Sequence, residues 1–154
     1  MTIRVLVADD QAMIRGALAG LLNLERDIEV VAQAADGVQA LEELTRLATQ
    51  DASLDATPTS SARSASPVDV AIIDIEMPHM DGITTTEAIR ARFPQVRVLI
   101  VTTFGRPGYL QRALDAGATG FMVKNAPVEA LAEGVRTVAA GGRAIDQSLA
   151  VEAL

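Results

Sequence analysis

The chain has 154 residues, of which 49% are hydrophobic and only 3% aromatic, and it contains no cysteine and a single histidine. This length suits one domain with a continuous core of Val, Ile, Leu, Ala and Met, and the lack of cysteine excludes disulfides, thiolate metal sites and cysteine nucleophiles. Twenty acidic residues against 13 basic ones give a formal net charge of −7, which repels nucleic-acid phosphates, so this chain by itself is not expected to bind DNA.

Short apolar runs rich in Val and Ile alternate along the chain with segments whose apolar residues recur at helical spacing. Each expected strand is apolar on both faces, which favours an α/β fold with a parallel sheet between two helical layers. One domain is expected over residues 1–140. The expected strands are 3–8, 28–33, 68–74, 96–101 and 119–123, and the expected helices are 11–24, 37–49, 83–93, 108–116 and 128–140.

Two segments do not follow this alternation. Residues 50–67 are rich in Ser, Ala, Thr and Pro, so we expect a long flexible loop there. That loop enters the third strand from the amino-terminal edge of the sheet and lies opposite any site at the carboxyl edge. Gly141 and Gly142 end the last helix, and residues 141–154 are expected to begin a linker or a short final helix.

Neither a signal peptide nor a membrane span is expected from the sequence patterns. The first apolar run is interrupted by Asp9 and Asp10, too early for the apolar region of a signal peptide. No run approaches the ~20 apolar residues of a membrane span. A cytoplasmic protein without membrane contact is therefore expected.

Polar side chains follow four of the five expected strands at the point where each strand ends. Because the carboxyl ends of parallel strands meet at one edge of a sheet, and ligands bind beyond that edge, we expect these side chains to lie together. They supply three aspartates, a hydroxyl group and an ammonium group. The residues are Asp9 and Asp10 after the first strand, Asp74 and Glu76 after the third, Thr102 after the fourth and Lys124 after the fifth.

Three carboxylates at one place repel one another, and a hard divalent cation such as Mg²⁺ neutralises them. We expect Asp10 and Asp74 to be its carboxylate ligands, with Asp9 acting through water and the Glu76 main-chain carbonyl supplying another oxygen. An aspartate can also carry a phosphoryl group as an acyl phosphate, a role that suits Asp74. Lys124 and the hydroxyl of Thr102 would then contact phosphoryl oxygens.

This ordered set of residues resembles the receiver domain of two-component response regulators, over about residues 3–140. The stretch 102–124 is particularly similar to the NarL/FixJ subfamily, whose members usually carry a LuxR-type helix-turn-helix output domain. The matching pieces are Asp9-Asp10, Asp74, the run Met77-Pro78-His79-Met80-Asp81-Gly82, Thr102, Phe121 and Lys124.

The resemblance implies a flavodoxin-like, doubly wound sheet of five parallel strands in the order 2-1-3-4-5, with five helices. It implies a phosphoacceptor switch rather than an enzyme: a sensor histidine kinase phosphorylates Asp74 with Mg²⁺ present, and the domain catalyses only its own phosphoryl transfer and dephosphorylation. Thr102 and Phe121 would form a coupled switch that promotes homodimerisation. DNA would be bound only through a C-terminal output domain that this chain lacks, giving transcription regulation.

Other interpretations remain open at this point. An alternative role for Thr102 is to cap a helix, and an alternative for Phe121 is that it is an ordinary core residue. One alternative function is a stand-alone receiver that acts through protein contacts. Another is a Mg²⁺-dependent aspartyl-phosphate phosphatase of the haloacid-dehalogenase type. Such enzymes need a second acid two residues after the nucleophile, and Glu76 has this spacing from Asp74. A nucleotide or flavin binder is disfavoured because the acidic pair after the first strand replaces a glycine-rich phosphate loop.

Overall fold

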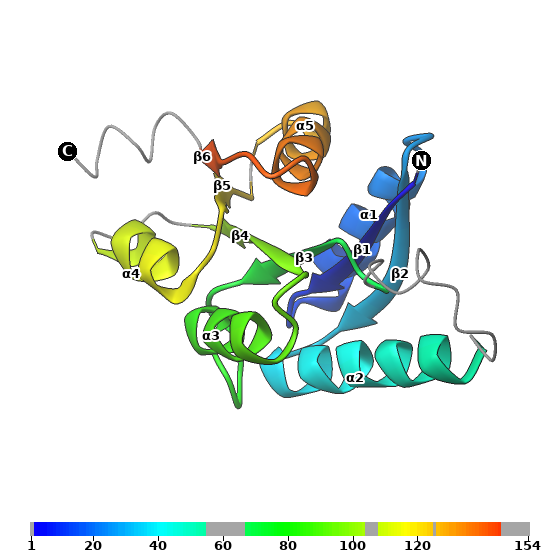
Figure 1. The fold of residues 1–154 in the computed structure, drawn as a ribbon. Helices are drawn as coiled ribbons and strands as arrows, with labels where there is room; N and C mark the ends of the chain where they lie inside the picture. The colour runs from blue at the N-terminus through cyan, green and yellow to red at the C-terminus, as the bar shows by residue number, and fades with distance from the viewer. Residues whose placement is uncertain (1, 55–66, 104–107, 125, 146–154) are drawn as a thin grey trace.

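The computed structural model describes residues 2–54, 67–103, 108–124 and 126–145 (Figure 1). Within these ranges the strands form one parallel sheet in the order β2-β1-β3-β4-β5-β6. The strands are β1 (Ile3–Ala8), β2 (Ile28–Ala34), β3 (Val70–Asp74), β4 (Arg97–Thr102), β5 (Gly120–Val123) and β6 (Ala144–Ile145).

Helices cover both faces of the sheet, as Figure 1 shows. Buried residues of α1 and α5 belong to the core cluster on one face, and those of α2, α3 and α4 belong to the cluster on the other. The helices are α1 (Ala12–Asn23), α2 (Gly37–Leu54), α3 (Gly82–Arg92), α4 (Tyr109–Ala116) and α5 (Val128–Ala139).

The central strands fill both core clusters with alternating residues. In β1, Val5 and Val7 face α1 and α5, whereas Leu6 and Ala8 face the other helical layer. This period of two follows from the pleat of a strand, and apolar residues on both faces are typical of a parallel sheet buried between helices. The α/β class, the five helices and the strand order 2-1-3-4-5 are therefore confirmed.

The structure adds a short strand that the sequence did not predict. β6 pairs with β5, with Ala144 opposite Gly120 and Ile145 opposite Phe121. The turn before it passes through Gly141, whose φ of 96° lies in the left-handed region that glycine adopts without strain. Residues 146–154 lie outside the described part of the chain, so a linker there stays a prediction.

The second helix is longer than expected. α2 continues to Leu54, so the first residues of the predicted 50–67 loop are helical. The reason is that no glycine or proline interrupts the sequence between Gly37 and Pro58. Residues 55–66 of the predicted loop lie outside the described ranges.

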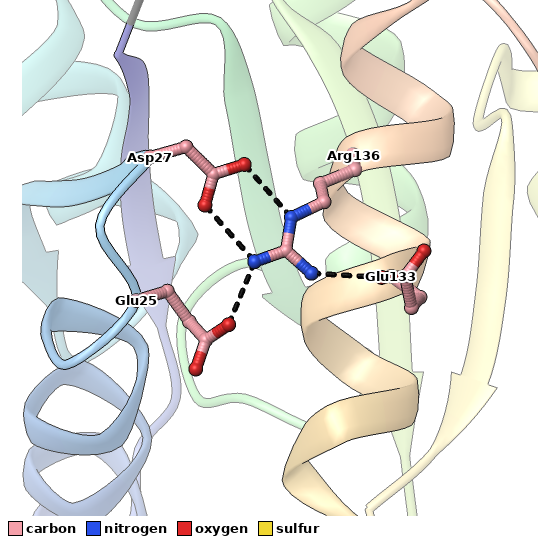
Figure 2. A network of polar contacts seen from close by, with 4 residues as sticks. All are labelled: Glu25, Asp27, Glu133 and Arg136. Atoms are coloured by element: carbon pink, nitrogen blue, oxygen red, sulfur yellow. Dashed lines mark hydrogen bonds and ion pairs between the residues drawn. The ribbon is translucent and has the colours of Figure 1, made fainter.

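Charged residues tie α5 to the turn between α1 and β2 (Figure 2). The guanidinium of Arg136 contacts both carboxylate oxygens of Asp27 at 2.8 and 2.9 Å, and it contacts Glu25 at 2.6 Å. Its third nitrogen donates to Glu133 on the same helix. These hydrogen bonds raise the pKa of Arg136 above its ordinary value and fix the packing of α5 beside α1.

The strand register aligns the carboxyl ends of the central strands. Asp74 at the end of β3 lies opposite Val101, and Thr102 at the end of β4 lies opposite Val123. Residues that follow these strands are thereby brought to one edge of the sheet. Among the described helices, none combines the length and the apolar character that crossing a membrane requires.

Candidate functional site

Three aspartates meet at the carboxyl edge of the sheet. Asp9 and Asp10 follow β1, and Asp74 ends β3. One carboxylate oxygen from each lies within 4.8 Å of the others. Asp9 and Asp74 are buried, with 2% and 6% of their surfaces exposed, whereas Asp10 is exposed. Bringing these like charges together in a largely buried place favours the binding of a cation.

A small cavity of about 140 Å³ opens beside the aspartates. It has room for an ion and a small anion rather than for a large substrate. Polar side chains dominate its lining, which consists of Asp10, Gln11, Asp74, Glu76, Thr102, Thr103 and Lys124. Gln11 and Thr103 were not among the predicted site residues, and their only signal in the sequence is that each directly follows a predicted site residue.

The ammonium group of Lys124 lies between two of the aspartates. Its Nζ is 2.7 Å from Asp9 Oδ2 and 3.1 Å from Asp74 Oδ2, and the side chain is only 10% exposed. Burial opposes the charge of Lys124, but its hydrogen bonds to Asp9 and Asp74 raise the pKa above its ordinary value. Lys124 is therefore charged at neutral pH and offsets part of the acidic cluster.

Asp74 differs from an ordinary exposed aspartate. Burial raises the pKa of Asp74, and the nearby charges of Asp9 and Asp10 act in the same direction, while the hydrogen bond from Lys124 opposes them. The net pKa is raised, so ionisation of Asp74 carries a cost in free energy within this site. A bound cation would reduce that cost.

The loop after β1 is fixed by hydrogen bonds of Asp9. Its Oδ1 accepts from the Gln11 N–H at 2.9 Å, and its own N–H donates to the Ala34 carbonyl on β2. On α1, Arg15 donates to the Asp9 main-chain carbonyl at 2.8 Å. Arg15 was not predicted as a site residue, because a single arginine in a helix gives no signal of where it points. These contacts leave the exposed Asp10 to line the cavity.

The start of α3 packs directly against the phosphoacceptor candidate. A Cβ atom at Gly82 would collide with the Asp74 carbonyl oxygen, so this position requires glycine. The Gly82 N–H donates to the Ile75 carbonyl at 2.8 Å, which closes the loop after β3. Asp81 caps the helix by accepting from the Thr84 N–H, as its position before the helix indicates.

The two candidate switch residues occupy different surroundings. Thr102 is buried and lines the cavity beside Asp74. Phe121 is fully buried in the core cluster beneath α2, α3 and α4, and it does not line the cavity. The structure thus brings together six of the seven predicted site residues and places Phe121 apart. The buried position of Phe121 is compatible both with a switch residue and with an ordinary core residue.

The fold and this acidic site define the class of protein. The sequence matches the family model of the response regulator receiver domain over residues 5–136, and the chain belongs to this family. The resemblance to receivers of the NarL/FixJ subfamily is confirmed by LuxR-type relatives and neighbours.

Individual relatives agree with this membership. The transcriptional regulatory protein DesR of Bacillus subtilis is 38% identical over 92% of this chain, and YvfU of the same species, described as an uncharacterized transcriptional regulatory protein, is 36% identical over 96%. The chain spans only 60% and 64% of the lengths of these two proteins.

A solved structure of a LuxR-family two-component response regulator from Aurantimonas sp. SI85-9A1 superposes on the chain with a TM-score of 0.81. It has 25% identity, and the match covers 99% of this chain and 96% of that one. The receiver domain of the putative response regulator NarL of Mycobacterium tuberculosis matches with a TM-score of 0.74 and 29% identity, covering 91% of this chain and 98% of that one. The likeness therefore extends along nearly the whole chain.

Proposed function

We propose that this receiver domain is a phosphorylation switch in which Asp74 accepts a phosphoryl group from a sensor histidine kinase. The observation that carries the proposal is the meeting of three aspartates and Lys124 at one small cavity on the carboxyl edge of the sheet. A parallel α/β sheet binds ligands at this edge. The proposed activity is a self-catalysed phosphoryl transfer and dephosphorylation, without turnover of a separate substrate.

The donor set at the cavity suits a magnesium ion. Carboxylate and carbonyl oxygens are the ligands that Mg²⁺ prefers, and a site of one or two carboxylates with phosphate oxygens is common. Asp10, Asp74 and the Glu76 carbonyl would hold the ion, with Asp9 acting through water. When bound, Mg²⁺ supplies positive charge that lets the carboxylates and an incoming phosphoryl group share the site.

The chain's own residues define the transfer step. A carboxylate oxygen of Asp74 attacks the phosphorus of a phosphohistidine on the kinase, the new O–P bond forms as the N–P bond breaks, and the imidazole departs. Lys124 moves from its contact with Asp74 toward a phosphoryl oxygen while it keeps Asp9 as a partner. The hydroxyl of Thr102 donates to a second phosphoryl oxygen. Residues such as these catalyse by position and charge.

The response to phosphorylation is proposed to be a change in association. Thr102 moves toward the phosphoryl group and Phe121 adjusts with it, which alters the helical surface. A homodimer then presents a C-terminal DNA-binding output domain to its target, and transcription changes. Support comes from the relatives DesR and YvfU, which are described as transcriptional regulatory proteins. A cytoplasmic location fits a partner that phosphorylates from inside the cell.

The central experiment adds beryllofluoride, a phosphoryl mimic, with Mg²⁺ and follows the mass of the protein by sedimentation. We expect binding that requires Mg²⁺ and a shift from monomer to dimer. The Asp74→Asn variant is the matched control and should neither bind beryllofluoride nor shift. Labelling with acetyl phosphate that persists in this variant would overturn the assignment of Asp74.

A further inference from the structure

The loop that joins β3 to α3 has a strained tip. Residues 75–81 begin directly after Asp74, and Glu76 at their start lines the cavity. At the tip, the Met80 N–H donates to the Pro78 carbonyl at 2.7 Å, which makes a three-residue turn around His79. Its φ is 68°, and within the described ranges it is the only non-glycine residue in the left-handed region.

A side-chain hydrogen bond ties this tip to a residue far away in the sequence. His79 Nδ1 lies 3.0 Å from Asp36 Oδ2, although the two residues are 43 positions apart. Asp36 is buried, with 5% of its surface exposed. Its Oδ1 accepts from the Gln39 N–H at 2.9 Å, so the same carboxylate caps the start of α2. The tip is thus fixed to a side chain that is itself fixed.

The proton in this contact belongs to the histidine. The hydrogen bond from the Gln39 N–H, opposed by burial and assisted by His79, lowers the pKa of Asp36 below its ordinary value. Asp36 is therefore ionised at neutral pH and can only accept hydrogen bonds. It follows that Nδ1 of His79 carries a proton in the neutral ring as well as in the charged one.

Close packing at two glycines supports the same arrangement. A Cβ atom at Gly37 would collide with Thr85 Oγ1 and lie 2.9 Å from the Met80 carbonyl oxygen, so the start of α2 packs directly on the loop. At the other end, Gly82 packs on the Asp74 carbonyl. The loop is held at its base beside Asp74 and at its tip by Asp36.

We propose that Asp36 and His79 are positioning residues that hold the 75–81 loop in the conformation that binds the divalent cation and the phosphoryl group. Neither side chain lines the cavity, so both act through the main chain of Glu76 and Asp74. A non-glycine residue stays in the left-handed region only when its surroundings hold it there. For His79 the contact that does so is the hydrogen bond to Asp36, which lies outside the cavity. This inference rests on the proposed function of the site.

Two variants at one position separate the contact from the strain. His79→Gly adopts the left-handed conformation without strain but has no side chain to reach Asp36. His79→Asn also tolerates that conformation, and its amide nitrogen can donate to the same carboxylate. The probes are Mg²⁺ alone, titrated by calorimetry, and beryllofluoride with Mg²⁺, observed by fluorine NMR. Thermal unfolding without Mg²⁺ serves as the measure of stability.

We expect His79→Gly to weaken Mg²⁺ binding roughly tenfold, the low end of the effect of residues that orient metal ligands. The Asn variant should restore most of the affinity. The unfolding temperature should not fall in the Gly variant together with the affinity, because glycine relieves the backbone strain, and it should not rise again in the Asn variant. Equal Mg²⁺ affinity in the wild type and His79→Gly would overturn the inference. Wild-type protein that binds neither probe would instead overturn the proposed function.

The only histidine of the chain also gives a direct spectroscopic test. Protein labelled with ¹⁵N-histidine yields one pair of ring nitrogen signals, and their chemical shifts in the neutral ring show which nitrogen carries the proton. We expect Nδ1 to be the protonated nitrogen in the wild type and Nε2 in Asp36→Ala. A wild-type ring protonated at Nε2 would show that the contact does not hold the loop.

Discussion

At the scale of single residues, the site is a balance of charge. Lys124 contacts Asp9 and Asp74, and the three aspartates still exceed the one ammonium group. Burial adds to this imbalance by raising the pKa of Asp74. The folded protein therefore carries unfavourable electrostatic free energy at a place where a cation and a phosphoryl group are proposed to bind, a common feature of functional sites.

The raised pKa predicts how Asp74 affects stability. Because the pKa of Asp74 is higher in the folded than in the unfolded protein, its favourable contribution is complete below the unfolded value of 3.8 and is lost as pH rises through the folded value. Asp74→Asn should therefore increase the free energy of unfolding at pH 7 by more than about 0.5 kcal/mol, the usual scatter of surface substitutions.

Urea unfolding without Mg²⁺ measures this difference at pH 7 and again near pH 3.5. The gain should shrink at the lower pH, where the wild-type carboxyl group is mostly protonated in both states. A variant that is no more stable than the wild type at pH 7 would contradict the electrostatic description of the site.

At the scale of elements, close approaches of backbone decide where the helices begin. α3 can start beside Asp74 only because Gly82 has no side chain to meet the Asp74 carbonyl. α1 contains two glycines of a different kind, since a Cβ atom at Gly16 or Gly20 would have no neighbour within 4 Å. Helical glycines in the same domain are thus expected to respond in opposite ways to substitution.

Gly82→Ala should destabilise the protein by about 1–3 kcal/mol, because the added methyl group must displace the backbone of Asp74. Gly16→Ala is the matched control, and it should be neutral or stabilise by up to about 1 kcal/mol through helix propensity. Chemical denaturation of both variants checks the pair. Equal effects of the two substitutions would show that the contact at Gly82 is relieved by a small shift.

The ion pairs of Arg136 join α5 to the turn before β2, as Figure 2 shows. The hydrogen bond from Arg136, against a smaller effect of burial, lowers the pKa of Asp27. A lowered pKa means that this stabilisation is present above the ordinary value of 3.8 and is lost as pH falls through the folded value.

Arg136→Met should lower the denaturation midpoint at neutral pH, and the difference from the wild type should diminish in acid and in high salt. Arg136→Lys is the control, because an ammonium group cannot bind both oxygens of Asp27 as the guanidinium does. It should recover only part of the midpoint. A midpoint of the Met variant that is unchanged at low salt would assign the network no role in stability.

At the scale of the whole molecule, one helix presents an apolar surface to solvent. On α1, Met13 and Leu21 are 89% and 40% exposed, and Leu24 at its end is 77% exposed. With Ala17 and Gly20 these residues recur at helical spacing on one face, and Arg15 is the only charged residue in the helix. An exposed apolar face of this kind suits a protein contact.

If dimerisation uses this face, Leu24→Glu should prevent the mass shift that beryllofluoride induces while leaving Mg²⁺ binding intact. Glu29→Gln, at an exposed position on β2, is a control that changes charge away from α1. Sedimentation with and without beryllofluoride gives the result. Normal dimerisation of Leu24→Glu would direct attention to another surface.

The sequence by itself determined the α/β class, the order of elements and six of the residues that meet at the cavity. Local patterns suffice for these features, because strands buried on both faces are continuous apolar runs and parallel strands deliver their carboxyl ends to one edge. Helix ends were predicted within a few residues, except for α2, which continues to Leu54.

Only the tertiary structure decided the remaining features. The pairing of β6 with β5 involves two residues, too few for a periodic pattern. The contacts of His79 with Asp36 and of Arg136 with Asp27 span 43 and 109 positions. Charged and polar residues at such separations give no local signal of their partners, because the choice depends on which loops the packed helices and strands bring within hydrogen-bonding distance.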